Sequence, residues 1–190
     1  PFNIPIKDIW RYRYILSVFV MRDFKAIYKQ TILGPLWTII QPIVTTIIYI
    51  VIFGNIINVN TNGMPHIIFF MSGIIIWNYF SRSTTSISQT FISNSHIFSK
   101  VYFPRIIVPL SIITSNLLHF LIQFSIFLIF LSYYIFTSQI TITINIILLP
   151  VPIILLALFS ITIGMIVASL SIKYRDLIYL FNFIIQLWMY

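Results

Sequence analysis

Residues 30–81 read QTILGPLWTIIQPIVTTIIYIVIFGNIINVNTNGMPHIIFFMSGIIIWNYFS, and none of them is Asp, Glu, Lys or Arg. A second stretch with the same property covers residues 106–172. An ionised side chain at the centre of a bilayer costs about 2.5–3.5 kcal/mol on insertion scales, so charged residues are pushed to the membrane edges. The two uncharged stretches therefore predict a membrane protein rather than a water-soluble one.

The charged residues gather in three short clusters, at residues 7–29, 82–105 and 173–176. Each uncharged stretch holds two apolar runs separated by a polar segment, as expected for two membrane crossings. Two crossings between successive clusters place all three clusters on one side of the membrane. Because 11 Lys and Arg face only 3 Asp and Glu, the positive-inside rule makes that side the cytoplasm, with a cytoplasmic N-terminus.

The predicted fold class is all-α, a polytopic membrane helical bundle that forms a single transmembrane domain over residues 1–190. We expect four full spans and a truncated fifth, at residues 36–53, 67–80, 106–131, 146–172 and 177–190. The last run reaches roughly 21 Å as a helix, which is short of a bilayer core of about 30 Å. The chain also begins with Pro rather than Met. We therefore expect a fragment of a six-span protein.

Basic and apolar residues alternate over residues 6–30, before the first predicted span. On a helix, five of the basic residues fall within a stripe of about 60°; they are Lys7, Arg11, Arg22, Lys25 and Lys29. This pattern is typical of an amphipathic helix that lies in the membrane interface. Two roles stay open for this interface helix, which are anchoring to membrane lipids and docking of a cytosolic protein.

Several kinds of chemistry lack candidate residues. The net charge of +8 is explained by cytoplasmic loops, so we expect no nucleic-acid partner. No carboxylate lies in a predicted span, no cluster of metal-ligating side chains is visible, and no glycine-rich phosphate loop is present. We therefore expect the chain to bind no metal or cofactor and to perform no catalysis, so that uphill transport would need energy from another subunit.

Aromatic residues make up 17% of the chain. Near the ends of spans, such residues commonly form belts at the membrane surface. The alternative is an aromatic lining for sugar rings, whose C–H faces stack on aromatic faces. The candidates for this lining are Trp37, Tyr49 and Trp77.

Three runs of sequence carry a family resemblance. They are RDFKAIYKQTILGPLW at residues 22–37 with Gln41-Pro42 after it, KVYFPR at residues 100–105 with Pro109-Leu110 after it, and KYRDL at residues 173–177 with Gln186 further on. In order and spacing they resemble the permease subunit of ABC transporters that export polysaccharides such as O-antigen, capsule or teichoic acid. The resemblance covers essentially the whole chain.

The resemblance implies an assembly in the bacterial cytoplasmic membrane. Two copies of the six-span subunit would pair with two cytosolic ATP-binding subunits, which hold the ATP and Mg, and a lipid-linked polysaccharide would pass between the copies. A coupling helix at about residues 91–104 would sit in a cleft of the ATPase, with contacts from Asn94, Lys100, Tyr102, Phe103, Pro104 and Arg105. The interface helix would contact the same partner through Arg22, Asp23, Lys25 and Lys29.

Two other functions stay open at this point. The first is an ABC exporter of small molecules with the same architecture. The second is a membrane enzyme that acts on lipid-linked sugars, which would need an essential acid or histidine near a membrane face. Only six residues of the chain qualify for that role: Asp8, Asp23, Asp176, His66, His96 and His119.

Overall fold

The computed structural model describes residues 10–28, 36–61, 63–98, 103–137 and 148–189. Within these ranges all regular structure is helical and no strand occurs, so the predicted all-α membrane bundle is confirmed. Among the helices described, three are long and apolar enough to cross a membrane: Leu36–Gly54, Ile107–Phe136 and Pro150–Ser171. The total number of spans stays a prediction.

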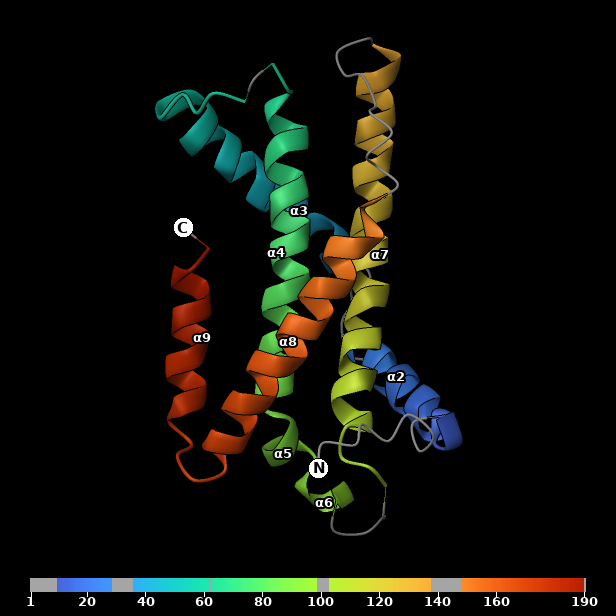
Figure 1. The fold of residues 1–190 in the computed structure, drawn as a ribbon. Coiled ribbons are helices and arrows are strands. Elements are labelled where there is room, and N and C mark those ends of the chain that lie inside the picture. The colour runs from blue at the N-terminus through green and yellow to red at the C-terminus, as the bar shows by residue number, and fades with distance from the viewer. Residues whose placement is uncertain (1–9, 29–35, 62, 99–102, 138–147, 190) are drawn as a thin grey trace.

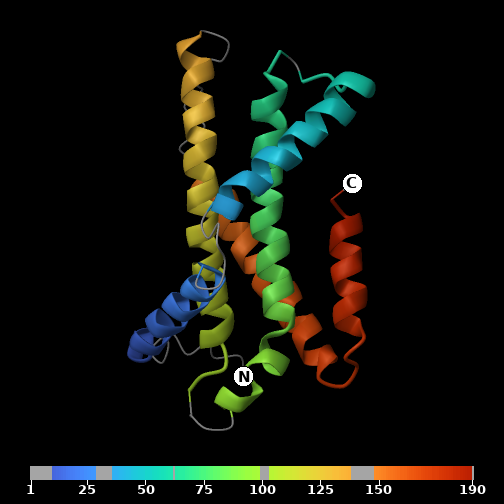
Figure 2. The ribbon, with the colours of Figure 1, turned by 180° about the vertical axis from the view of Figure 1, so that it is seen from behind.

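The helices follow one another along the chain with short connections. In order they are α2 (Arg13–Tyr28), α3 (Leu36–Tyr49), the π-helical segment η1 (Ile50–Ile56), α4 (His66–Ser88), α5 (Thr90–Ser93), α6 (Ser95–Phe98), α7 (Ile107–Phe136), α8 (Pro150–Ser171) and α9 (Leu177–Leu187). Figures 1 and 2 show α4 in the middle of the bundle, with α3 crossing it on one face and α8 on the other. Helix α4 therefore organises the packing.

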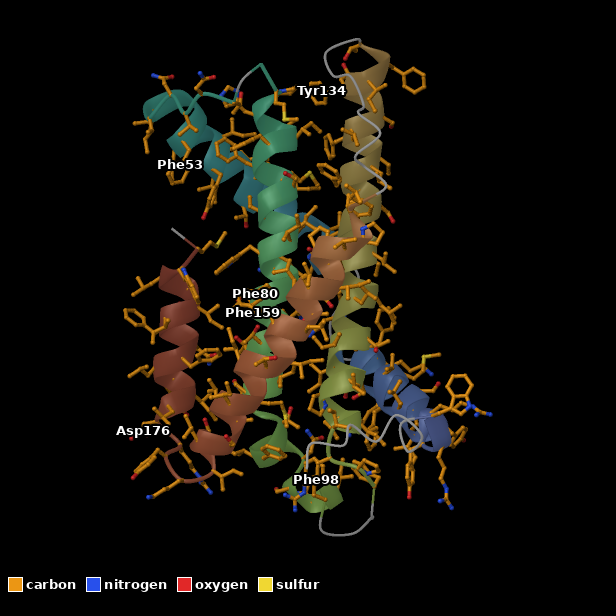
Figure 3. The ribbon with its side chains drawn as sticks, in the orientation of Figure 1. Phe53, Phe80, Phe98, Tyr134, Phe159 and Asp176 are labelled. Carbon is orange, nitrogen blue, oxygen red and sulfur yellow. The ribbon has the colours of Figure 1, made fainter. Side chains whose placement is uncertain are left out.

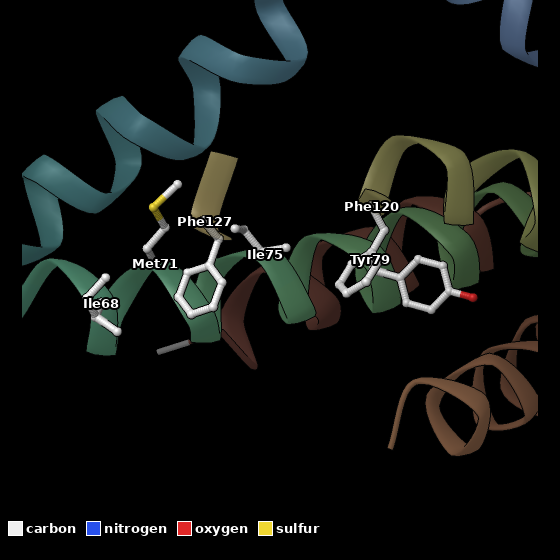
Figure 4. Packing of buried hydrophobic residues seen from close by; sticks show 6 residues of the cluster. All are labelled: Ile68, Met71, Ile75, Tyr79, Phe120 and Phe127. Carbon is white, nitrogen blue, oxygen red and sulfur yellow. The ribbon is translucent and has the colours of Figure 1, made fainter. Parts of the chain in front are cut away.

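The main hydrophobic core lies between α4 and α7. Ile68, Met71, Ile75 and Tyr79 recur every three or four residues and so share one face of α4. Phe120 and Phe127 of α7 complete this buried cluster, as the close view in Figure 4 shows.

Small residues let α8 approach α4 closely. Ser160, Gly164 and Ala168 recur every four residues on α8, and all three are buried. A Cβ atom placed on Gly164 would lie only 2.7 Å from Cβ of Ile87. Such small side chains are what close helix crossings in membranes require.

The charged elements collect at one end of the bundle. Figure 3 places Phe98 of α6 and Asp176 of the α8–α9 turn at that end, and Phe53 and Tyr134 at the other. Helix α2, which carries the first charged cluster, also packs at the end of the bundle that holds α5 and α6 (Figures 1 and 2). The described parts of the three clusters thus lie toward one end, as two crossings between clusters require.

Several helix bounds differ from the sequence-based expectation. Helix α4 passes the predicted span end at residue 80 and carries Arg82 inside the helix. The hydroxyl of Thr84 donates to the carbonyl of Phe80 at 2.7 Å, so polar side chains are satisfied without ending the helix. Helix α7 likewise passes residue 131 and ends at Phe136.

Two further expectations concern the ends of the predicted elements. The single coupling helix expected near residues 91–104 forms two one-turn helices, α5 and α6, within its described part. The interface helix expected over residues 6–30 is seen as α2, because residues 1–9 and 29–35 lie outside the described ranges.

Candidate functional site

The most polar feature of the bundle is a cavity of about 470 Å³ between α3, α4, α7 and α9, called here the inner cavity. Its lining includes six side-chain carboxamides, which are Gln41, Asn78, Asn116, Gln123, Asn182 and Gln186. The guanidinium-bearing Arg82 and the ring of His119 also line it. Cavities of this size are typical of small-molecule sites.

Helical spacing brings these side chains together. Asn78 and Arg82 lie one turn apart on α4, and Asn182 and Gln186 lie one turn apart on α9. Asn116 and Gln123 lie two turns apart on α7. Polar residues at intervals of three or four thus form a stripe on each helix, and the three stripes face one cavity.

A second cavity of about 430 Å³, the outer cavity, lies toward the charged end of the bundle and is lined from α2, α4, α5 and α7. It shares Arg82, Ser86 and Asn116 with the inner cavity. The two cavities therefore adjoin, and the shared side chains form the boundary between them.

Two polar atoms in these walls have free hydrogen-bonding capacity. Oγ of Ser115 and Oδ1 of Asn182 are buried, and neither has a hydrogen-bond partner among the described residues. By contrast, Nδ2 of Asn116 donates to Oγ of Ser83 at 3.3 Å. Buried polar groups normally find partners, so the two unpartnered atoms favour a role in binding a polar ligand.

The outer cavity adjoins a polar junction between α2 and the α5–α6 segment. Nε of Arg22 donates to Oδ1 of Asp23 at 2.8 Å, and Nη2 of Arg22 donates to Oδ1 of Asn94 at 3.3 Å. Nδ2 of Asn94 in turn donates to the carbonyl of Thr90 at 3.1 Å. The side chain of Asn94 therefore joins α2 to α5.

An aromatic cluster reinforces this junction. The ring of Phe103 lies 5.5 Å from Phe19 of α2 and 5.6 Å from Phe98 of α6. Phe103 is buried together with Ile107 and Val108 at the start of α7. Helix α2, helix α6 and the start of α7 thus pack as one unit.

The predicted coupling contacts differ in accessibility. Arg105 is exposed, Pro104 is half-buried, and Asn94 and Phe103 are buried. Lys100 and Tyr102 lie outside the described residues. Of the described members of this set, Arg105 presents the most accessible side chain for a partner protein.

The predicted contacts of the interface helix also divide into two groups. Lys25 is exposed on α2, whereas Arg22 and Asp23 are engaged with each other and with Asn94. Lys29 lies outside the described residues. His119, which the sequence places within a span, packs its ring 5.2 Å from Phe24 of α2.

The three aromatic candidates for a sugar path are not brought together. Trp37 is exposed on α3, Tyr49 packs 5.2 Å from Phe53, and Trp77 packs 5.5 Å from Phe80. None of the three lines the inner or the outer cavity. The carboxamides that do line the inner cavity were not predicted, although their spacing within apolar runs could have indicated them.

The apolar helices and the enclosed polar cavity define a multi-pass membrane protein, and sequence comparison gives its family. The family model described as ABC-2 type transporter matches residues 14–190, so the chain belongs to the ABC-2 type transporter family. Within the part of the chain that the structure describes, no group of three His, Asp or Glu side chains could hold a metal ion.

Three curated relatives share one description, O-antigen export system permease protein RfbA. The relative from Myxococcus xanthus is 26% identical over 185 residues, which cover 97% of this chain and 69% of that protein. Two relatives from Klebsiella pneumoniae are each 31% identical, over 163 and 165 residues, and both alignments cover 86% of this chain and 61% of the relative. The chain therefore spans about two thirds of the length of these relatives.

Proposed function

We propose that the chain is the permease subunit of an ATP-driven exporter that moves a lipid-linked polysaccharide across the bacterial cytoplasmic membrane. The observation that carries the proposal is the inner cavity, whose six carboxamides lie within an otherwise apolar bundle. A carboxamide both donates and accepts hydrogen bonds, as a sugar hydroxyl does, so the two groups are complementary. The names of the three relatives favour O-antigen as the glycan.

The energy for export comes from a separate cytosolic subunit that binds ATP and Mg. No glycine-rich phosphate loop occurs in the 190 residues, which supports this division of labour. The partner would dock at the charged end of the bundle, which faces the cytoplasm by the excess of Lys and Arg. Exposed Arg105 and Lys25 are the contacts that we favour there.

Two copies of the chain would form the export path together. Helices α3 and α9 both contribute to the inner cavity, through Gln41 on α3 and through Asn182 and Gln186 on α9. Their other faces are apolar and exposed, with Ile47 and Ile48 on α3 and Phe183 on α9. A path between the first and fifth spans of the two copies would therefore have polar walls close to each copy's cavity.

The test is deletion of the gene for the full-length protein in its own bacterium, followed by complementation. We expect loss of glycan from the cell surface and accumulation of lipid-linked glycan on the cytoplasmic side, both reversed by the wild-type gene. Unchanged glycan display with altered sensitivity to toxic small molecules would instead identify a small-molecule exporter. Loss of display on alanine substitution of only an aspartate or histidine, with the ATPase complex intact, would support a membrane enzyme.

A further inference from the structure

Arg82 occupies a special position in the bundle. It lies on the central helix α4 and lines both the inner and the outer cavity. Its neighbours one turn away on the same face, Asn78 and Ser86, also line the inner cavity. A ligand that enters either cavity therefore meets the Arg82 side chain.

The charges in the cavity walls favour an anion. In the outer cavity, Arg22 and Arg82 face a single carboxylate, that of Asp23. Asp23 is already compensated, because Nη2 of Arg22 lies 2.8 Å from its Oδ1. In the inner cavity, Arg82 is the one Lys, Arg, Asp or Glu in the lining. A guanidinium among apolar helices is costly, and a phosphate offsets that cost through charge-assisted, bidentate hydrogen bonds.

The surroundings of Arg82 favour a hydroxyl-rich group next to the anion. Carboxamides from α3, α4, α7 and α9 converge on the inner cavity. Oδ1 of Asn182 and Oγ of Ser115 supply further hydrogen-bonding capacity that the described protein atoms do not use. Both kinds of group suit a sugar ring, whose hydroxyls need partners that donate and accept.

An apolar pocket adjoins this polar site. It has a volume of about 130 Å³ and lies between α4, α7 and α8, with mostly apolar side chains such as Ile75, Phe124 and Leu156. Tyr79 and Phe120, whose rings lie 5.4 Å apart, line both this pocket and the inner cavity. Polar and apolar surfaces thus meet at one pair of rings, which suits a ligand with a polar head and a hydrocarbon tail.

We infer that each chain holds an entry site for its substrate at Arg82. The guanidinium binds the phosphate that joins a glycan to its lipid carrier, and the carboxamides of the inner cavity bind the adjacent sugar. This inference rests on the proposed function and deepens it, because it assigns the anionic linkage of the substrate to particular residues of this chain.

The experiment uses the full-length protein in complex with its ATPase subunit, reconstituted in nanodiscs of uncharged lipid. Three probes are titrated: a synthetic lipid in which a phosphodiester joins glucose to a long alkyl chain, an alkyl glucoside with the same chain, and glucose 1-phosphate. We expect the wild-type complex to bind the phosphodiester lipid at least about tenfold more tightly than either other probe.

Variants assign that preference to the site. Arg82→Gln should abolish the preference for the phosphodiester lipid over the alkyl glucoside, and Arg82→Lys should retain most of it. Asn182→Leu should weaken both lipid probes to a similar degree, because it alters the sugar contact rather than the charge. Arg175→Gln, in the exposed α8–α9 turn outside both cavities, should bind like the wild type.

The competing results are separable. A preference for the phosphodiester lipid that survives in both Arg82→Gln and Arg82→Lys at wild-type strength would overturn the inference. Equal competition by phosphatidylglycerol would also overturn it, because the site would then be one for phospholipid headgroups. Equally tight binding of glucose 1-phosphate would overturn the role of the lipid. If the wild-type gene restores glycan display in cells while any of these results holds, the proposed function stands and only the entry site fails.

Discussion

Arg22 of α2 donates a hydrogen bond from Nη2 to Oδ1 of Asn94, at 3.3 Å, across 72 residues of sequence. The same guanidinium lies 4.7 Å above the ring of Phe19. Asn94 sits between the one-turn helices α5 and α6, so this bond joins the interface helix to the segment expected to couple with an ATPase. A push on one of these elements is therefore transmitted directly to the other.

Replacement of Asn94 tests this junction. Asn94→Leu removes the acceptor for Arg22 and the donor to the Thr90 carbonyl, and we expect it to lower stability by about 1–3 kcal/mol. Asn94→Asp keeps an acceptor for Arg22 and should retain more glycan export than Asn94→Leu. Thermal unfolding and glycan display measure the two effects. Equal export by both variants would show that the Arg22 contact does not contribute.

Close packing of α4 and α8 predicts that Gly164 tolerates no side chain. Gly164→Ala would place its Cβ 2.7 Å from Ile87, and we expect a loss of about 1–3 kcal/mol. The matched control is Gly73→Ala on α4, where an added Cβ meets no atom within 4 Å. Thermal unfolding should separate the two variants. Adding Ile87→Ala to Gly164→Ala should recover part of the loss, and the absence of any recovery would contradict the packing argument.

The aromatic cluster at Phe103 predicts a second, local defect. Phe103→Ala should cost about 3–5 kcal/mol, because a buried ring between α2, α6 and α7 is removed. Protease cleavage within α2 should become faster, since α2 loses part of its contact surface. Phe136→Ala is the control, because that ring is 87% exposed. Similar cleavage rates in the two variants would refute the role of Phe103 in holding α2.

The proposed docking of an ATPase predicts an effect of charge reversal at Arg105. Arg105→Glu should reduce co-purification of the ATPase subunit several-fold, because an exposed cation at the coupling end is replaced by an anion. Arg175→Glu makes the same change in an exposed turn and should have the smaller effect. A complex of unchanged yield with both variants would remove Arg105 from the docking surface.

The fold class could be predicted because the bilayer acts on each residue in much the same way wherever it lies in the sequence. The absence of charges from residues 30–81 and 106–172 follows from desolvation alone and needs no knowledge of packing. The confirmed all-α bundle and the family membership both rest on features that short runs of sequence display. The coupling contacts and the partner subunits stay predictions.

The inner cavity could not be predicted in the same way. Asn78, Asn116 and Asn182 each look like an isolated polar residue in an apolar run, and only the packing of α4, α7 and α9 brings them to one space. The accessibility of Asn94 was equally hidden, because its burial depends on Arg22 and on the aromatic cluster around Phe103.

Desolvation of charges thus set the class of this protein and the grouping of its charged elements from the one-dimensional order of residues. Helix crossing, by contrast, depends on side-chain shapes far apart in the chain, such as Gly164 against Ile87. Tertiary packing alone therefore decided which polar side chains face a common cavity, and it placed Arg82 between the two cavities.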